Sequence, residues 1–199
     1  MSKINKRRNS NRIPQHDYSL NGYYFITVCS FNRLNIFGEI INNNKIVGAD
    51  GCRPENNTIK IQLNEFGAIV EQELKNTENI RHEIKLDEYV IMPNHIHCII
   101  IIQRNITDDE IVTGGQPAAP TDIVNCKQTL SSFVAGFKSI VTKRINILRN
   151  TPKCSVWQRS FYDHIVRNDK SLCLIRKYIR DNPLTWKDDE YNSVCNQTM

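Results

Sequence analysis

The stretch VIMPNHIHCIIII, residues 90–102, decides the fold. It sets two imidazoles into an apolar run of the kind found in buried strands. Alternate residues of a strand share a face, so His95 and His97 point the same way, about 7 Å apart along the chain. Ile96 and Cys98 point to the opposite face, into the core. Because a buried polar group costs free energy unless it finds a partner, something must meet the two rings.

The segments around this strand alternate between strand and helix patterns. We expect strands at 22–31, at 86–103 as a pair or one long strand, and at 156–167, with helices at 64–80, 129–148 and 169–183 and a hairpin-like excursion after the first strand. Asn64 should cap the first helix, and Pro93 should interrupt a ladder or mark a bulge. The order predicts an α+β fold with helices packed on a mostly antiparallel sheet.

The length and composition indicate one globular domain. Of 199 residues, 40% are hydrophobic and 24% charged. We divide the chain into a flexible basic arm at 1–17, a single domain at 18–190 with excursions at 42–58 and 104–125, and a tail at 191–199. No signal-peptide core and no apolar run of membrane-spanning length occurs in the sequence. Seven scattered cysteines without a C-x-x-C pair favour reduced thiols in a cytoplasm.

Positive charge is concentrated in two segments. Residues 1–16 carry five basic side chains and no acidic one, and residues 127–180 carry 12 basic and two acidic ones. One interpretation is a solvated basic helix face. The other, which we favour, is a polyanionic partner, and nucleic acid above all.

The two histidines form a natural half of a divalent-metal site. The alternative is a pair of ordinary histidines satisfied by backbone or water. The H-x-H pattern also occurs in metallo-hydrolases, but those usually continue with an Asp-His pair, whereas Cys98 and four isoleucines follow here.

A second candidate group lies in the last predicted helix. Tyr178 and Asn182 are four residues apart and therefore share a helical face. Together they would bring a nucleophile and a third metal ligand to the same ion. Asn182 directly precedes Pro183 and would equally serve as a helix cap, and Tyr178 alone would pass for a tyrosine at the edge of the core. The spacing leaves these alternatives open.

At this point four ordered blocks resemble a known family. The blocks MPNHIHCIIII, FKSIVTKRIN, VWQRSFYDHIVRN and IRKYIRDNPLTW are similar to those of single-tyrosine HUH transposases, and more narrowly of REP-associated tyrosine transposases, relatives of the transposases of small single-stranded insertion sequences. The resemblance runs from about residue 20 to 186. It implies a ferredoxin-like sandwich, metal binding by His95, His97 and Asn182, and catalysis by Tyr178. The 42–58 excursion and the loop around Gly114 depart from the compact family pattern.

The function that the resemblance implies is metal-dependent DNA strand transfer in a bacterial cytoplasm. Tyr178 would cleave and rejoin a single-stranded hairpin from a palindromic repeat through a 5′-phosphotyrosine. The working ion would be Mg²⁺ or Mn²⁺, although such a site also suits Ni²⁺ or Zn²⁺. The alternatives are a catalytically silent hairpin-binding protein and a metallo-hydrolase. We expect a monomer, with a dimer as the alternative, and no membrane partner.

Basic and aromatic side chains are the candidates for DNA contacts. Those for the phosphate backbone are Lys6, Arg7, Arg8, Lys138, Lys143, Arg144, Arg159, Arg167, Arg176, Lys177 and Arg180. Those for stacking on bases are Phe31, Trp157 and Tyr162. Tyr162 is also the rival nucleophile, although its predicted strand offers no ligand residue at helical spacing. His164 shares its strand face and would support the metal site, contact DNA or simply pack.

Overall fold

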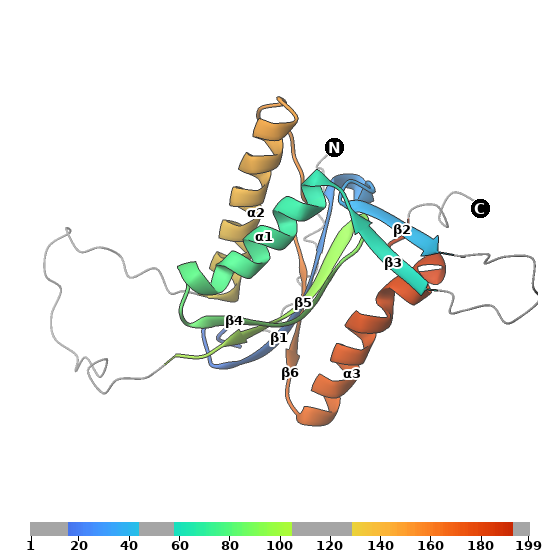
Figure 1. Cartoon of the computed structure of the whole chain (residues 1–199). Helices are drawn as coiled ribbons and strands as arrows, with labels where there is room; N and C mark the ends of the chain where they lie inside the picture. Colours follow the sequence, from blue (N-terminus) through green and yellow to red (C-terminus); the bar gives the residue numbers. More distant parts are fainter. Residues whose placement is uncertain (1–15, 44–57, 105–128, 193–199) are drawn as a thin grey trace, which may run out of the picture.

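The computed structural model describes residues 16–43, 58–104 and 129–192. Its main sheet has four antiparallel strands in the order β4-β5-β1-β6 (Figure 1). The strand bounds are β1 (Gly22–Cys29), β4 (Ile84–Ile91), β5 (His95–Ile102) and β6 (Tyr162–Val166). The strand that carries the two histidines is therefore central, with a hydrogen-bonded neighbour on each side.

Helices cover both faces of this sheet. α1 (Glu65–Ile80) and α2 (Leu130–Leu148) lie on one face, and α3 (Asp169–Asp181) lies on the other (Figure 1). Each helix begins after a polar residue whose side chain accepts backbone N–H groups of the first turn, and these caps are Asn64, Thr129 and Asn168. The predicted α+β class, the antiparallel sheet and the three helices are confirmed.

The central region is a pair of strands rather than one long strand. Met92, Pro93 and Asn94 connect β4 to β5, and the Met92 N–H donates to the His95 carbonyl at 2.8 Å. Pro93 thus lies in the connection, where its missing N–H costs no ladder bond. The irregularity in pairing lies elsewhere, within β4 between Leu86 and Tyr89.

A separate two-stranded sheet forms the predicted hairpin-like excursion. β2 (Gly38–Asn43) pairs antiparallel with β3 (Thr58–Leu63). Its base sits against α1 at Gly67, where any Cβ would overlap the Phe37 carbonyl, so only glycine permits this approach. Most of the excursions predicted at 42–58 and 104–125 lies outside the described residues.

The prediction of a strand over 156–167 is wrong for its first half, because β6 covers only Tyr162–Val166. Trp157 makes one isolated bridge, to Ser30, just past the end of β1. The Lys138 ammonium binds two carbonyl oxygens of this segment, which a regular ladder would otherwise engage. Trp157 is also buried, so it is not the exposed stacking platform proposed from the sequence.

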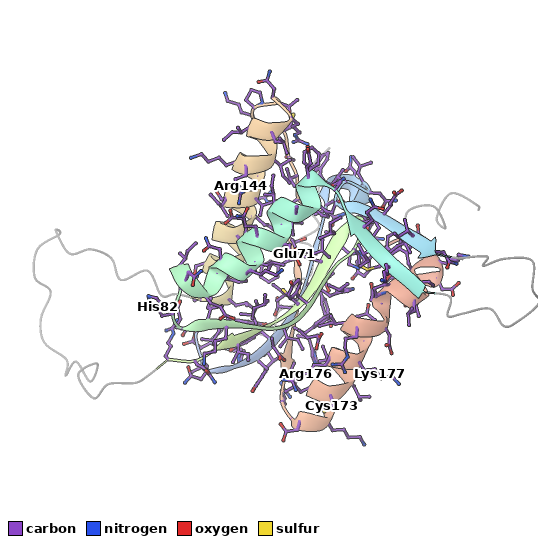
Figure 2. The ribbon with its side chains drawn as sticks, viewed as in Figure 1. Glu71, His82, Arg144, Cys173, Arg176 and Lys177 are labelled. Atoms are coloured by element: carbon purple, nitrogen blue, oxygen red, sulfur yellow. The ribbon has the colours of Figure 1, made fainter. Side chains whose placement is uncertain are left out.

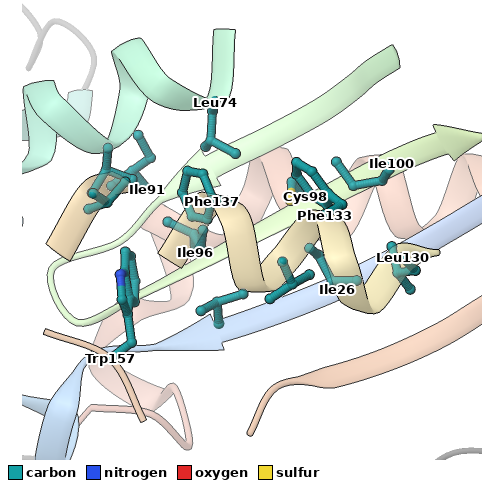
Figure 3. Close-up of a cluster of buried hydrophobic side chains, with 14 of the residues drawn as sticks. Ile26, Leu74, Ile91, Ile96, Cys98, Ile100, Leu130, Phe133, Phe137 and Trp157 are labelled. Atoms are coloured by element: carbon teal, nitrogen blue, oxygen red, sulfur yellow. The ribbon is translucent and has the colours of Figure 1, made fainter. Parts of the chain in front are cut away.

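The two faces of β5 are buried in different surroundings. On one face, alternate residues enter the larger core beneath α1 and α2, as predicted for Ile96 and Cys98 (Figure 3). On the other face, Ile99 joins a smaller cluster with Phe25, Leu172 and Ile179 of β1 and α3. His95 and His97 lie on this second face, which places them between the sheet and the C-terminal part of the chain.

Candidate metal centre and nucleophile

The two histidines of β5 converge on one point. Their Nε2 atoms are 3.1 Å apart and their ring centroids 4.5 Å apart. Both side chains are buried, with 0% of His95 and 1% of His97 exposed. They lie on the face opposite to Ile96 and Cys98, as predicted, and this face also holds the smaller apolar cluster, with His97 stacked on Phe25.

Asn94 fixes the tautomer of His95. The Asn94 Nδ2 group donates to the carbonyl oxygens of Arg33 and Tyr191, at 3.1 and 2.7 Å, and carbonyls can only accept. The Asn94 Oδ1 atom must therefore face His95, where it lies 2.8 Å from Nδ1. This oxygen accepts the Nδ1–H proton, which leaves an unprotonated lone pair on His95 Nε2.

Thr27 holds the second ring. Its hydroxyl lies 2.8 Å from His97 Nδ1, because Thr27 pairs directly with His97 in the β1–β5 ladder. A hydroxyl can donate or accept, so His97 is free to present either a lone pair or an N–H at Nε2. The two rings thus have partners in Asn94 and Thr27 that the sequence interpretation did not identify.

Tyr178 of α3 lies beside the two histidines. Its hydroxyl lies 3.2 Å from His97 Nε2, and its ring packs edge-on against Phe25. The opposite flank of the helix is tied to β4 by a two-bond ion pair between Arg176 and Asp87, at 2.8 and 3.0 Å, and by Arg180 with Glu88. These pairs fix the helix so that Tyr178 faces the histidines.

Asn182 lies one turn after Tyr178 and is 1% exposed. It occupies the C-cap position of α3, as the capping alternative predicted, and its backbone stays helical (φ −54°, ψ −41°) as the chain continues into a 3₁₀ helix over Asn182–Asp188. Its Nδ2 group donates to Asp189 Oδ2 at 3.1 Å. Its Oδ1 atom is buried without a hydrogen-bond partner among the described residues.

Burial sets the protonation states at this point. It lowers the pKa of His97 to about 3 and holds the pKa of His95 well below its usual value, with the neighbouring His97 adding to the effect. Burial, with the acidic Asp189 and Glu190, raises the pKa of Tyr178 to about 12. At neutral pH both imidazoles are therefore uncharged, and the phenol keeps its proton.

These atoms suit a divalent cation. Two imidazole Nε2 atoms, of which that of His95 carries a lone pair, lie close to the buried amide of Asn182, which interacts with His95 and whose oxygen has no hydrogen-bond partner among the described residues. Imidazole nitrogen and amide oxygen are both accepted by ions such as Mn²⁺ and Zn²⁺. In the described ranges no group of three or more His, Cys, Asp or Glu side chains offers a metal site.

The other predicted residues divide between the two sides of the sheet. On the α3 side, Tyr162 is 40% exposed and packs edge-on against Phe25, and His164 is exposed beside it on β6. Arg159, Arg167 and Lys177 are also exposed.

On the α2 side the basic residues are largely engaged. Arg144 pairs with Glu73 of α1, at the side of the sheet opposite to Arg176 and Lys177 (Figure 2). Lys138 donates to two backbone carbonyls, and burial lowers its pKa to about 8. Lys143 is exposed on the same helix. Lys6, Arg7 and Arg8 lie outside the described residues.

Four residues around the site were not identified from the sequence: Thr27, Asn94, Asp189 and Tyr191. The Tyr191 ring centroid lies 4.7 Å from that of His95, although the sequence division placed this residue in the tail. Only Asn94 offered a signal, because it directly precedes the first histidine in PNHIH.

Among the described helices, none is long and apolar enough to cross a membrane.

Known proteins resemble this chain to different degrees. No protein-family model matches it. An uncharacterized protein of Haemophilus influenzae is 34% identical over 183 residues, covering 92% of each chain. The structure of a REP-associated tyrosine transposase bound to a REP hairpin has a TM-score of 0.51 at 17% identity, over 88% of this chain and 73% of that one. A candidate transposase from Deinococcus radiodurans has a TM-score of 0.41 at 12% identity, over 85% and 97%.

Proposed function

Since this chain belongs to one family with the Haemophilus influenzae protein and has the fold of a REP-associated tyrosine transposase, we propose that it is a metal-dependent, single-tyrosine DNA strand transferase. Its substrate is single-stranded DNA folded as a hairpin, the ligand in the similar transposase structure. One observation carries the proposal: the Tyr178 hydroxyl lies 3.2 Å from His97 Nε2, beside the His95 ring and the unsatisfied Asn182 oxygen.

Tyr178 is the nucleophile of the proposed reaction. Its Oη atom attacks the scissile phosphorus, the Oη–P bond forms as the P–O3′ bond breaks, and the phenolic proton is released. The products are a 5′-phosphotyrosine and a free 3′-hydroxyl. The covalent bond retains the energy of the phosphodiester, so that a second 3′-hydroxyl can reverse the step without a nucleotide cofactor.

His95, His97 and Asn182 would hold the ion. A divalent ion bound there would polarise the phosphate and offset the charge that builds on its oxygens. The need for it follows from Tyr178, whose raised pKa of about 12 makes the unaided phenol a poor nucleophile at neutral pH. Tyr178 is 44% exposed, so a strand that approaches from solvent can contact its side chain.

The α3 side of the sheet offers a path for that strand. Thr27 pairs with His97 on one side and with Tyr162 on the other, so these three residues form one row across the same face. Neighbouring strands are about 4.8 Å apart, which puts Tyr162 roughly 10 Å from the histidine. An exposed aromatic ring at that distance would stack on a base next to the scissile phosphate. Arg159 and Arg167 flank this strand and would bind the backbone.

The test is the capture of a covalent adduct. The parental protein is incubated with single-stranded hairpin DNA from beside its own gene and with Mn²⁺ or Mg²⁺, then run on a denaturing gel. Tyr178→Phe deletes the attacking oxygen and leaves the ring packed on Phe25, so the adduct should disappear while hairpin binding remains. Tyr162→Phe is the matched control, and it should keep the adduct.

The opposite pattern, with the adduct lost in Tyr162→Phe and kept in Tyr178→Phe, would exclude the helix-based site. Hairpin binding without an adduct in the parental protein, at any of the divalent ions, would identify a catalytically silent hairpin-binding protein instead.

A further inference from the structure

The amide of Asn182 can be useful as a ligand in only one of its two orientations. Rotation of the amide by half a turn exchanges its oxygen, which binds cations, for an NH₂ group, which cannot. The surrounding chain must therefore fix the amide if the oxygen is to face the histidines. One contact in the structure does so.

Asp189 accepts a hydrogen bond from the Asn182 Nδ2 group at 3.1 Å. A carboxylate oxygen offers no proton, so it selects the NH₂ group of the amide and turns the oxygen toward the other side. On that other side the Asn182 oxygen is buried and unsatisfied among the described residues. A buried acceptor left open in this way costs free energy, which is the expected condition of a ligand before its ion arrives.

The segment that carries Asp189 is itself held to the histidine pair. The other oxygen of Asp189 accepts the Tyr191 N–H at 2.7 Å, and the Tyr191 carbonyl accepts from Asn94, which fixes His95. The same short segment therefore orients two of the three ligands, Asn182 through Asp189 and His95 through Asn94.

We propose that Asp189 is a positioning residue that aims the Asn182 oxygen at the metal site, and that it does so through its hydrogen bond rather than through its charge. The inference rests on the proposed metal site of His95, His97 and Asn182. Removal of residues that orient metal ligands commonly lowers metal affinity by about 10- to 100-fold.

The experiment is a calorimetric titration of the DNA-free protein with Mn²⁺. Asp189→Ala should weaken Mn²⁺ binding by about tenfold or more. Glu190→Ala is the matched control, because it removes the same charge one residue away while the backbone carbonyl that Arg33 contacts remains. It should change the affinity by less than about threefold.

The same substitution in a second variant protein, Asn182→Asp, distinguishes orientation of the ligand from a general structural role of Asp189. Asn182→Asp provides a carboxylate with two equivalent oxygens, so either orientation presents a ligand atom to the ion. The nearby Asp189 carboxylate repels this new negative charge. In that background Asp189→Ala should no longer weaken Mn²⁺ binding, and should strengthen it. The change of sign is the signature of positioning, since a merely structural role would weaken binding in both backgrounds.

Equal losses in the two backgrounds, or an equal loss in Glu190→Ala, would overturn the inference and leave the metal site standing. A parental protein that binds no Mn²⁺, or binds it equally after His97→Ala, would overturn the metal site and the inference together. Adduct formation by the parental protein then tells whether the tyrosine chemistry survives that result.

Discussion

The two faces of β5 differ sharply although their residues alternate along one strand. Ile96, Cys98 and Ile100 on one face meet only the apolar core beneath α1 and α2. His95 and His97 on the other face are equally buried but meet Asn94, Thr27 and the C-terminal segment. One face therefore supplies stability, and the other holds the candidate metal ligands on the same rigid strand.

The comparison explains why the positions of the two histidine side chains are well fixed in the fold. A strand in the middle of a sheet has backbone partners on both sides, and its position is further set by the apolar face. The candidate metal ligands on the remaining face are held by that rigidity without contributing to it. Changes on the two faces should consequently separate activity from folding.

The largest expected effect is on the chemical face. His97→Ala should lower adduct formation by at least about a hundredfold, because the residue is a proposed ligand of the ion and contacts Tyr178. Hairpin binding should remain, since the exposed basic residues are unchanged. Gel assays of adduct and of hairpin binding measure the two properties, and cleavage at the parental rate would refute the ligand assignment.

On the apolar face, Ile96→Ala should lower the free energy of unfolding by about 2–5 kcal/mol, because it leaves a cavity in the larger core. Ile101→Ala on the same strand is the control and should cost less, since that side chain is only partly buried. Urea denaturation gives both values. The folded Ile96→Ala protein should bind Mn²⁺ with parental affinity, and a loss of that affinity would show that the faces are coupled.

Lowering the pH should lower the free energy of unfolding, because of the two buried histidines. Because burial lowers the pKa of both histidines, the unfolded chain binds protons below about pH 6.5 that the folded protein excludes, so stability falls as the pH falls. Each histidine that stays neutral contributes about 1.4 kcal/mol per pH unit. Urea denaturation of the metal-free protein between pH 7 and 5 measures the slope, and His97→Gln should make it shallower. An unchanged slope would mean that His97 takes up its proton in the folded state.

The smallest expected effect concerns DNA. Arg167→Ala should reduce the slope of log affinity against log salt by about one, since this exposed residue lies in the connection between β6 and α3. Arg144→Ala should leave the slope unchanged, because its guanidinium is paired with Glu73 on the other side of the sheet. Hairpin titrations at several salt concentrations test both, and the reverse result would move the DNA path to α2.

The parts of the molecule that the sequence predicted are those that local rules determine. Alternation in a strand assigned the faces of Ile96 and His97, and capping chemistry located the helix start after Asn64. The spacing of Tyr178 and Asn182 predicted one shared helical face, whereas only the family resemblance implied that both side chains meet the histidines, as they do in the structure.

The remaining parts depend on contacts that no local pattern encodes. The Asn94 side chain donates to the Tyr191 carbonyl, 97 residues away in the sequence. Lys138 donates to the Gln158 carbonyl, in the segment that the Ser30–Trp157 bridge holds beside the end of β1. Asp189 is only seven residues from Asn182, yet their contact requires the 3₁₀ turn over Asn182–Asp188, which a Pro183 after a helix does not by itself predict.

The order of β5, β6 and α3 along the chain also sets the order in which the candidate site is synthesised. Tyr178 follows His97 by 81 residues, so a ribosome that adds about 5–20 residues per second delivers the nucleophile roughly 4–16 s after the histidine pair. β6, which closes the free edge of β1, and α3, which covers the histidines, arrive together at the end. Under the proposed function, a nascent chain therefore presents the histidine pair before the tyrosine, and it gains strand-transfer activity only after α3 has been synthesised.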